Sequence, residues 1–234
     1  MSFKKIIPVL ASLIVLCGPA LRAGDAAIFV NLGFSPDGAY YMFAQYGVRS
    51  GTLRPWADLS VIDVARNDFV QGGRLSYIHD RPIVAGQDGM GAMHSLIARN
   101  ARTAERHNII FPNQGQPLYI ALCGGPAFEG EEISFRDFTS GIRYRARLTE
   151  TVIGEGNNVR SSFFISLTAT DEHDGRVTTH TIGTPQLWRP LILSYRIRKV
   201  LIAPTGDSLI FVIQMRERAG NTHNIRYMVE ALRL

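Results

Sequence analysis

The sequence predicts a mainly β fold, in which antiparallel sheets pack as in a β-sandwich and carry propeller-blade-like hairpins, plus one amphipathic helix near residues 91–107. Short apolar or alternating segments bounded by Gly, Pro, Asn and Asp recur along the chain, which is typical of strands. One segment instead repeats its apolar residues at the three- and four-residue spacing of a helix. A Pro-Gly turn also precedes an apolar strand at two places.

The strand segments alternate with turn residues from the start of the β-rich region to its end. We expect strands at 27–32, 40–45, 59–64, 118–122, 133–138, 143–152, 162–170, 176–182, 191–202, 208–215 and 224–232. Within 142–152, Tyr144, Ala146 and Leu148 alternate with arginines, which predicts one buried and one solvated face. The Asp-Gly pair in 171–175 favours the positive φ of a tight hairpin between two of these strands. The acidic residues of this loop lack the spacing of a calcium-binding loop.

The helical segment covers residues 91–107. Met93, Leu96, Ile97, Ala101 and Ala104 lie on one face of a helix, and charged residues fall elsewhere. We expect a helix of about four turns that covers the apolar face of a sheet. The glycine-rich segment 86–91 before it lacks the Lys-Ser/Thr ending of a phosphate-binding loop, and therefore predicts a connector.

Two similar turns are the clearest architectural signal. Pro36, Asp37 and Gly38 precede the first aromatic strand, and Pro204 and Gly206 precede the strand 208–215 at matching offsets. Proline presets φ for a turn, and glycine accepts the left-handed corner. We expect blade-like units of strand, turn and strand. The sequence between the two turns has no comparable period, so a closed propeller ring is not expected.

The first 23 residues have the three-part layout of a secretory signal peptide. Lys4 and Lys5 precede an apolar core at 6–17, and Ala23 ends a cleavage region of small residues. The core is shorter than the roughly 20 apolar residues that a membrane helix needs. We therefore expect export to the periplasm or cell envelope, and a single β-rich domain over 24–234 without a transmembrane span. A lipid anchor at Cys17 and an uncleaved anchor are the alternatives.

Charge and cysteine content exclude two classes of protein. The chain has 25 Lys and Arg against 20 Asp and Glu, a net charge of +5. Three basic residues (Lys4, Lys5 and Arg22) and no acidic ones lie in the leader, so 22 against 20 remain, a net charge of +2. This balance argues against nucleic-acid binding. Cys123 is the one cysteine after the leader, so an intramolecular disulfide is excluded and a buried thiol is expected.

Both ends of the β-rich region resemble a known family. The segments 33–38 (Gly-Phe-Ser-Pro-Asp-Gly), 46–48 (Tyr-Gly-Val) and 61–64 (Val-Ile-Asp-Val), with Pro55 between them, are similar to the opening of the predicted secreted proteins grouped as domain of unknown function 2259. The stretch from 195 through Pro204 to the last strand resembles that family's ending. The family's usual Gly-Phe-Glu-Gly-like segment is replaced by 217–221 (Glu-Arg-Ala-Gly-Asn). The resemblance implies export and a shared fold, and it implies no activity.

For function, we expect a non-catalytic binding or scaffold module with no cofactor and no metal, because no nucleophile, base and acid motif or metal-ligand spacing is recognisable. The best candidate surface is the loop 46–56, where Tyr46, Arg49, Arg54 and Trp56 supply residue types enriched at interface hot spots. Its partner would be a protein or a cell-envelope ligand. The competing interpretation is an ordinary hairpin loop whose Trp56 folds back onto the core. A secreted hydrolase with a site assembled in space and an outer-membrane-associated β protein are the alternative functions.

Overall fold

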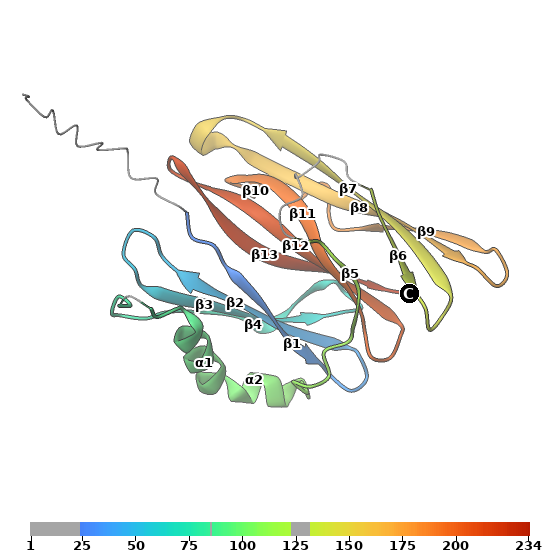
Figure 1. Cartoon of the computed structure of the whole chain (residues 1–234), viewed down its shortest axis with the longest axis horizontal. Coiled ribbons are helices and arrows are strands. Elements are labelled where there is room, and N and C mark those ends of the chain that lie inside the picture. Colours follow the sequence, from blue (N-terminus) through green and yellow to red (C-terminus); the bar gives the residue numbers. More distant parts are fainter. Residues whose placement is uncertain (1–23, 85, 123–131) are drawn as a thin grey trace, which may run out of the picture.

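The computed structural model describes residues 24–84, 86–122 and 132–234. In these residues three antiparallel sheets stack face to face, and helices cover the outer side of the first sheet (Figure 1). The predicted mainly β, antiparallel fold is thereby confirmed. The predictions for the leader, Cys17 and Cys123 concern residues outside the described ranges.

The first sheet is a four-stranded meander in the order β1-β2-β3-β4. Its strands are β1 (Ile28–Phe34), β2 (Tyr40–Val48), β3 (Pro55–Asp63) and β4 (Asp68–Ile78). Successive side chains of β2 point to opposite faces, as in any strand. Met42, Ala44 and Tyr46 pack towards the helices, whereas Tyr41 and Phe43 pack towards the middle sheet. Both faces of β2 are therefore buried.

Helices α1 (Met90–Arg99) and α2 (Ala101–Arg106) lie in the predicted helical segment and cover the first sheet (Figure 1). Ala92, Met93 and Leu96 bury against the sheet, as their spacing requires. The helix is interrupted at Asn100, which has φ −120° and ψ 24°. Its side-chain Nδ2 donates to the Leu96 carbonyl at 2.8 Å, so the amide competes with the backbone for a helical acceptor.

The middle sheet has the order β13-β12-β11-β5 and is covered on both sides. Its strands are β5 (Gln116–Ile120), β11 (Ile192–Ile202), β12 (Ser208–Ala219) and β13 (Thr222–Arg233). On β12, Ile210 and Val212 face the first sheet, and Phe211 and Ile213 face the third. Burying each such side chain contributes about 1.5–3 kcal/mol, so β12 is central to the stability of the fold.

The third sheet has the order β10-β8-β7-β6, and β9 also pairs with β8. Its strands are β6 (Glu132–Asp137), β7 (Ile142–Ile153), β8 (Arg160–Asp171), β9 (Val177–Ile182) and β10 (Arg189–Pro190), with a short 3-10 helix, η1 (Gly156–Asn158), between β7 and β8. On β7, Tyr144, Ala146 and Leu148 are buried, and the intervening arginines are exposed. The predicted alternation is therefore observed, and the Asp-Gly loop joins β8 to β9 as expected.

The two similar turns adopt the same conformation and lie against each other. Gly38 and Gly206 have φ of 69° and 76°, and each donates its N–H to the carbonyl three residues earlier, Ser35 and Ala203, at 3.0 and 2.9 Å. Pro36, Asp37 and Pro204 complete these turns at the sequence positions expected. A Cβ placed on Gly38 would lie 2.7 Å from Thr205 Oγ1, so the turns of the first and middle sheets are in contact.

Strand β4 is absent from the predicted strands, and its sequence explains why. Gly72 and Gly73 interrupt its alternation, and most of its residues are exposed or half-buried. Gly72 has φ of 68°, and the pairing register shifts between Ser60 and Ile62 on the neighbouring β3. Such a bulge breaks the period of two by which a strand is recognised in a sequence. The two-residue strand β10 is too short to carry any period.

Candidate binding site

The loop proposed from the sequence is shorter in the structure. Strand β2 continues to Val48 and β3 begins at Pro55, so Gly47 pairs with Trp56 and Val48 pairs with Pro55. The connection itself consists of residues 49–54, which we call the 49–54 loop. Tyr46 and Trp56 are therefore strand residues whose side chains point to opposite faces of the first sheet.

Both aromatic side chains are in the protein interior. Tyr46 is 4% exposed and packs in the core between sheet and helices, where burial, and next the charge of Asp88, raises the pKa of its phenol. Trp56 is 5% exposed, and the Arg226 guanidinium lies 4.3 Å from its ring centroid. Its Nε1 has no hydrogen-bond partner among the described residues. Of the four predicted binding residues, only Arg49 and Arg54 reach the surface.

Arg54 is bound to the segment that follows β4. Its Nε donates to the His79 carbonyl at 2.7 Å, and its Nη2 lies 3.4 Å from Asp80 Oδ1. The backbone of the same segment also reaches the loop, because the Ile83 N–H donates to the Leu53 carbonyl at 2.8 Å. Arg49, in contrast, is exposed. The structure thus separates a surface arginine from a half-buried one.

The tip of the 49–54 loop presents a leucine in an unusual backbone conformation. Leu53 has φ of 53° and is 52% exposed. Its N–H donates to the Arg49 carbonyl at 2.7 Å, and the Arg49 N–H donates to the Arg54 carbonyl at 3.0 Å. A non-glycine residue in the left-handed region costs of order 1 kcal/mol or more and persists only where its surroundings hold it. The loop is therefore rigid, and it displays an apolar side chain in solvent.

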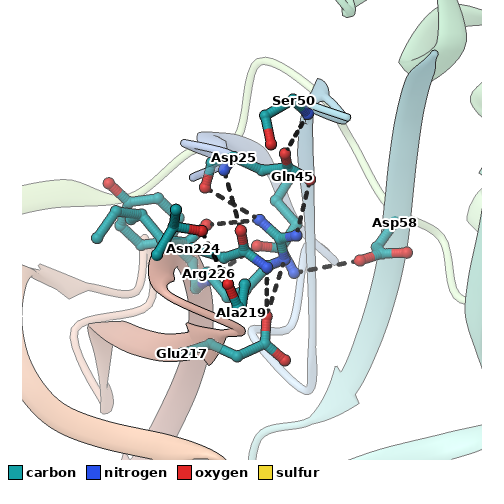
Figure 2. A network of polar contacts seen from close by, with 11 residues as sticks. Asp25, Gln45, Ser50, Asp58, Glu217, Ala219, Asn224 and Arg226 are labelled. Atoms are coloured by element: carbon teal, nitrogen blue, oxygen red, sulfur yellow. Dashed lines mark hydrogen bonds and ion pairs between the residues drawn. The ribbon is translucent and has the colours of Figure 1, made fainter. Parts of the chain in front are cut away.

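A half-buried polar network is hydrogen-bonded to the 49–54 loop through the backbone of Ser50. Figure 2 shows Arg226 near the centre of this network. The Arg226 Nη2 lies 3.3 Å from Asp25 Oδ2, and its Nε lies 3.7 Å from Glu217 Oε2. The other oxygen of Asp25 accepts the backbone N–H of Ser50, at 2.5 Å. One carboxylate thus joins the start of the described chain, β13 and the loop.

A second set of contacts in Figure 2 connects the first sheet to the same network. Gln45 Nε2 donates to Asp58 Oδ2 at 3.3 Å, and Gln45 Oε1 accepts the Tyr227 N–H at 2.8 Å. The Asp25 N–H donates to Asn224 Oδ1 at 2.9 Å. The groups of the network are paired with backbone groups, side-chain amides or opposite charges, which is the arrangement of a structural clamp.

The residues that form this clamp carry no recognisable signal in the sequence. Asp25 and Arg226 are 201 positions apart, and each stands in an ordinary alternating segment. The pairing depends on the bridge between Ala26 and Ile225, which brings the start of the described chain beside β13 in parallel. Only the three-dimensional arrangement of the strands makes the clamp visible.

In the part of the chain that the structure describes, three histidines make side-chain hydrogen bonds to nearby residues. His79 Nδ1 contacts the backbone of Arg81, His107 Nδ1 contacts the Thr103 carbonyl, and His223 Nδ1 contacts Arg216. Desolvation, followed by the charges of Arg216 and Arg218, lowers the pKa of His223. Among the residues that the structure describes, no three His, Cys, Asp or Glu side chains converge as a metal site.

Comparison with known protein families gives a match to most of the chain. The family model described as "Predicted secreted protein (DUF2259)" matches residues 42–233, and the chain belongs to this family. The resemblance to this family predicted from the sequence is thereby confirmed. No curated protein and no solved structure matches the chain. In the described ranges, no helix has both the length and the apolar character needed to cross a membrane.

Proposed function

We propose that this predicted secreted protein is a non-catalytic binding module of the periplasm or cell envelope, and that its 49–54 loop contacts the partner. Arg49, Leu53 and Arg54 form the contact surface, and Tyr46 and Trp56 hold the strands on either side of it. The secreted family supports the location, and the rigid loop supports the binding role. An exposed apolar side chain flanked by arginines is a combination suited to a protein surface.

The observation that carries this proposal is Leu53. Nothing in the packing of the described residues requires a leucine at a position with φ of 53° and half of its surface in water. Glycine would remove the strain, whereas the leucine keeps it and leaves about half of its own surface in water. Strained residues that are held in place by their surroundings cluster at binding sites, which favours a role in recognition.

Substitution of Leu53 separates recognition from stability. Leu53→Gly is expected to keep or raise the free energy of unfolding, because glycine adopts this φ without strain. The same variant is expected to lose the partner. A photo-crosslinking amino acid at position 53, expressed in the native cell, should give a discrete adduct that is absent when the probe stands at Glu105 on α2, which is also exposed. Equal adducts at both positions, or none at 53, would contradict the proposal.

We also propose that the leader is removed before Gly24. A Cβ on Gly24 would lie 1.7 Å from the His223 carbonyl oxygen, so the first described residue already packs against the backbone at the start of β13. Asp25, directly after it, is buried in the clamp. The small residues Ala20 and Ala23 at the end of the predicted leader support cleavage at this point, and Gly24 and Asp25 then belong to the folded domain. N-terminal sequencing of the native protein should begin at Gly24, and recovery of Met1 or of a lipidated Cys17 would contradict this.

No observation in the described residues favours the alternative functions. In the described residues, the hydrogen bonds of His79, His107 and His223 are to backbone carbonyls, a backbone N–H and an arginine, and none of them orients a base towards a nucleophile. The network around Arg226 pairs its charges internally. The hydrolase and the outer-membrane-associated protein therefore have no specific geometric support of the kind that Leu53 gives to the binding module.

A further inference from the structure

The outer face of the third sheet is a regular array of arginine and hydroxyl side chains. Cross-strand pairing places residues of β6, β7, β8 and β9 side by side in successive rows. The central row is Ser134, Arg145, Thr168 and Thr179; the rows on either side are Glu132, Arg147, Ser166 and Thr181, and Arg136, Arg143, Thr170 and Val177. Neighbouring rows are about 7 Å apart along the strands.

The arginines of the two outer rows form ion pairs with glutamates, whereas Arg145 in the central row forms none among the described residues. Arg136 and Arg143 both contact Glu172, the latter at 2.5 Å, and Arg147 lies 3.4 Å from Glu132. Arg145 is exposed and has no hydrogen bond or ion pair with another described residue. Its cross-strand neighbours are the hydroxyls of Ser134 and Thr168, which cannot neutralise it. The face therefore has an uncompensated positive charge at its centre and a net positive charge of two.

Exposed aromatic rings stand at both ends of this array. Phe138, directly after β6, is 80% exposed, and the Arg136 guanidinium lies 5.1 Å from its ring centroid. Trp188 is 39% exposed, and the Arg160 guanidinium lies 5.6 Å from its ring centroid. Arg160 begins β8 and has the same parity as Ser166, so it belongs to the outer face. Each aromatic ring thus lies beside an arginine side chain and is exposed to solvent.

The shape of the face is a strip open to solvent among the described residues. Strand β8 has 12 residues and so spans about 40 Å from the tryptophan end to the far end. Figure 1 shows the helices on the opposite side of the molecule, against the first sheet. Among the described residues, the first sheet thus has a helical cover that the third sheet lacks, and the outer side chains of β7 and β8 are mostly polar, with Ile153 and Phe164 as the apolar exceptions.

We propose that this face binds a linear polysaccharide that carries carboxylate groups. The planar guanidinium of Arg145 matches a carboxylate with two parallel hydrogen bonds. The rows of Ser and Thr supply donors and acceptors for sugar hydroxyls at the spacing of the strands. Trp188 and Phe138 offer flat apolar surfaces for the C–H faces of sugar rings. A regular strip with these three chemistries fits an extended repeating ligand better than a globular one, and it lies on a different layer from the 49–54 loop.

The test uses the purified protein in affinity electrophoresis with polygalacturonate, a linear polymer of a uronic acid, and with neutral dextran. We expect retardation by polygalacturonate and none by dextran. Arg145→Glu should weaken binding by about tenfold or more, because it replaces a charge-assisted contact by repulsion. Arg102→Glu on α2, which is an equal change of charge at an exposed arginine on the opposite side, should change it by less than about twofold. If Arg145→Glu does not fold, Arg145→Gln gives the same comparison.

A second arm distinguishes a polysaccharide from any polyanion. Trp188→Ala should weaken binding of polygalacturonate and leave that of inorganic polyphosphate unchanged, because polyphosphate has no sugar face to stack on the ring. The proposal is overturned if wild-type protein does not bind polygalacturonate, or if Arg102→Glu is as harmful as Arg145→Glu. Binding of polyphosphate or nucleic acid that equals binding of polygalacturonate, with no effect of Trp188→Ala, would also overturn it, since the face would then select charge alone.

Discussion

Truncation of Trp56 to alanine provides a direct test of how the candidate site is built. In the structure this ring is 5% exposed, contacts the Arg226 guanidinium at 4.3 Å, and packs on Gly47, where an added Cβ would lie 3.1 Å from Nε1. A tryptophan that made contact with a partner through the loop surface would instead be removable at little cost to folding. A buried ring and a surface ring therefore predict different free energies of unfolding for Trp56→Ala.

The magnitude follows from three contributions. Truncating a buried tryptophan costs about 3–5 kcal/mol through lost transfer energy and the cavity left behind. Loss of the contact with Arg226 adds about 1–2 kcal/mol. Removal of an indole N–H that has no partner among the described residues returns about 1–3 kcal/mol. We expect Trp56→Ala to lower the free energy of unfolding by about 3–5 kcal/mol. Trp56→Phe, which keeps a ring and removes the N–H, should lower it by much less.

The assay is denaturation by urea followed by circular dichroism, since Trp56 is one of two tryptophans and fluorescence would change with the substitution itself. The control is Arg49→Ala, an exposed residue of the same hairpin, which should change the free energy of unfolding by less than about 0.5 kcal/mol. An unchanged slope with denaturant would show that the same two states are being compared. If Trp56→Ala lowers the free energy of unfolding by less than about 1 kcal/mol, the buried placement of the ring is refuted.

Three further outcomes are expected. Gly38→Val should lower the free energy of unfolding by about 1–3 kcal/mol in the same assay, because φ is 69° and the new Cβ would press on Thr205; an unchanged value would contradict the left-handed corner. The hydrogen bond from Ser35 lowers the pKa of Asp37, so its stabilisation is present above the ordinary carboxyl pKa and is lost as pH falls through the lowered one; Ser35→Ala should raise that pKa in an NMR titration. Burial, and next the charge of Asp137, raises the pKa of Tyr144 to about 12, and its hydroxyl has no partner among the described residues; Tyr144→Phe should be neutral or stabilising, and a loss above about 2 kcal/mol would show that the hydroxyl is bonded.

The sequence predicts the sheets well because their information is local. Alternation along β7 assigns Tyr144, Ala146 and Leu148 to one face, and the structure buries all three. Proline and glycine mark both turns, since their backbone preferences act within four residues. The break in the helix at Asn100 is less predictable, because asparagine is tolerated in helices and interrupts this one through a hydrogen bond of its side chain to Leu96.

The candidate site is predicted less well, for a reason specific to its aromatic residues. The expected strands ended at Gln45 and began again at Leu59, which left Tyr46 and Trp56 in the loop. Pairing continues three residues beyond Gln45 and begins four residues before Leu59, because Gly47 lets the Trp56 ring lie close to the backbone. That pairing moves both rings into the interior. Their partners, the helices and Arg226, come from distant parts of the chain, and no local pattern indicates them.

The repeated turns connect the first sheet to the middle sheet. In both the first and the middle sheet, the residue after the turn glycine accepts an N–H from the end of the third strand, Ala39 from Val64 at 2.9 Å and Asp207 from Leu234 at 2.7 Å. The equivalent turns then pack through Gly38 and Thr205, which fixes how these sheets stack.

The three stacked sheets have different roles in the protein. The middle sheet is buried on both faces and supplies stability, whereas the first sheet carries the 49–54 loop and the third carries the row with Arg145. Because the two surfaces belong to layers separated by the middle sheet and share no contact residue, substitutions at Leu53 and Arg145 should act independently. A protein with this arrangement can hold a polymer with one layer while presenting the loop of another layer to a second partner.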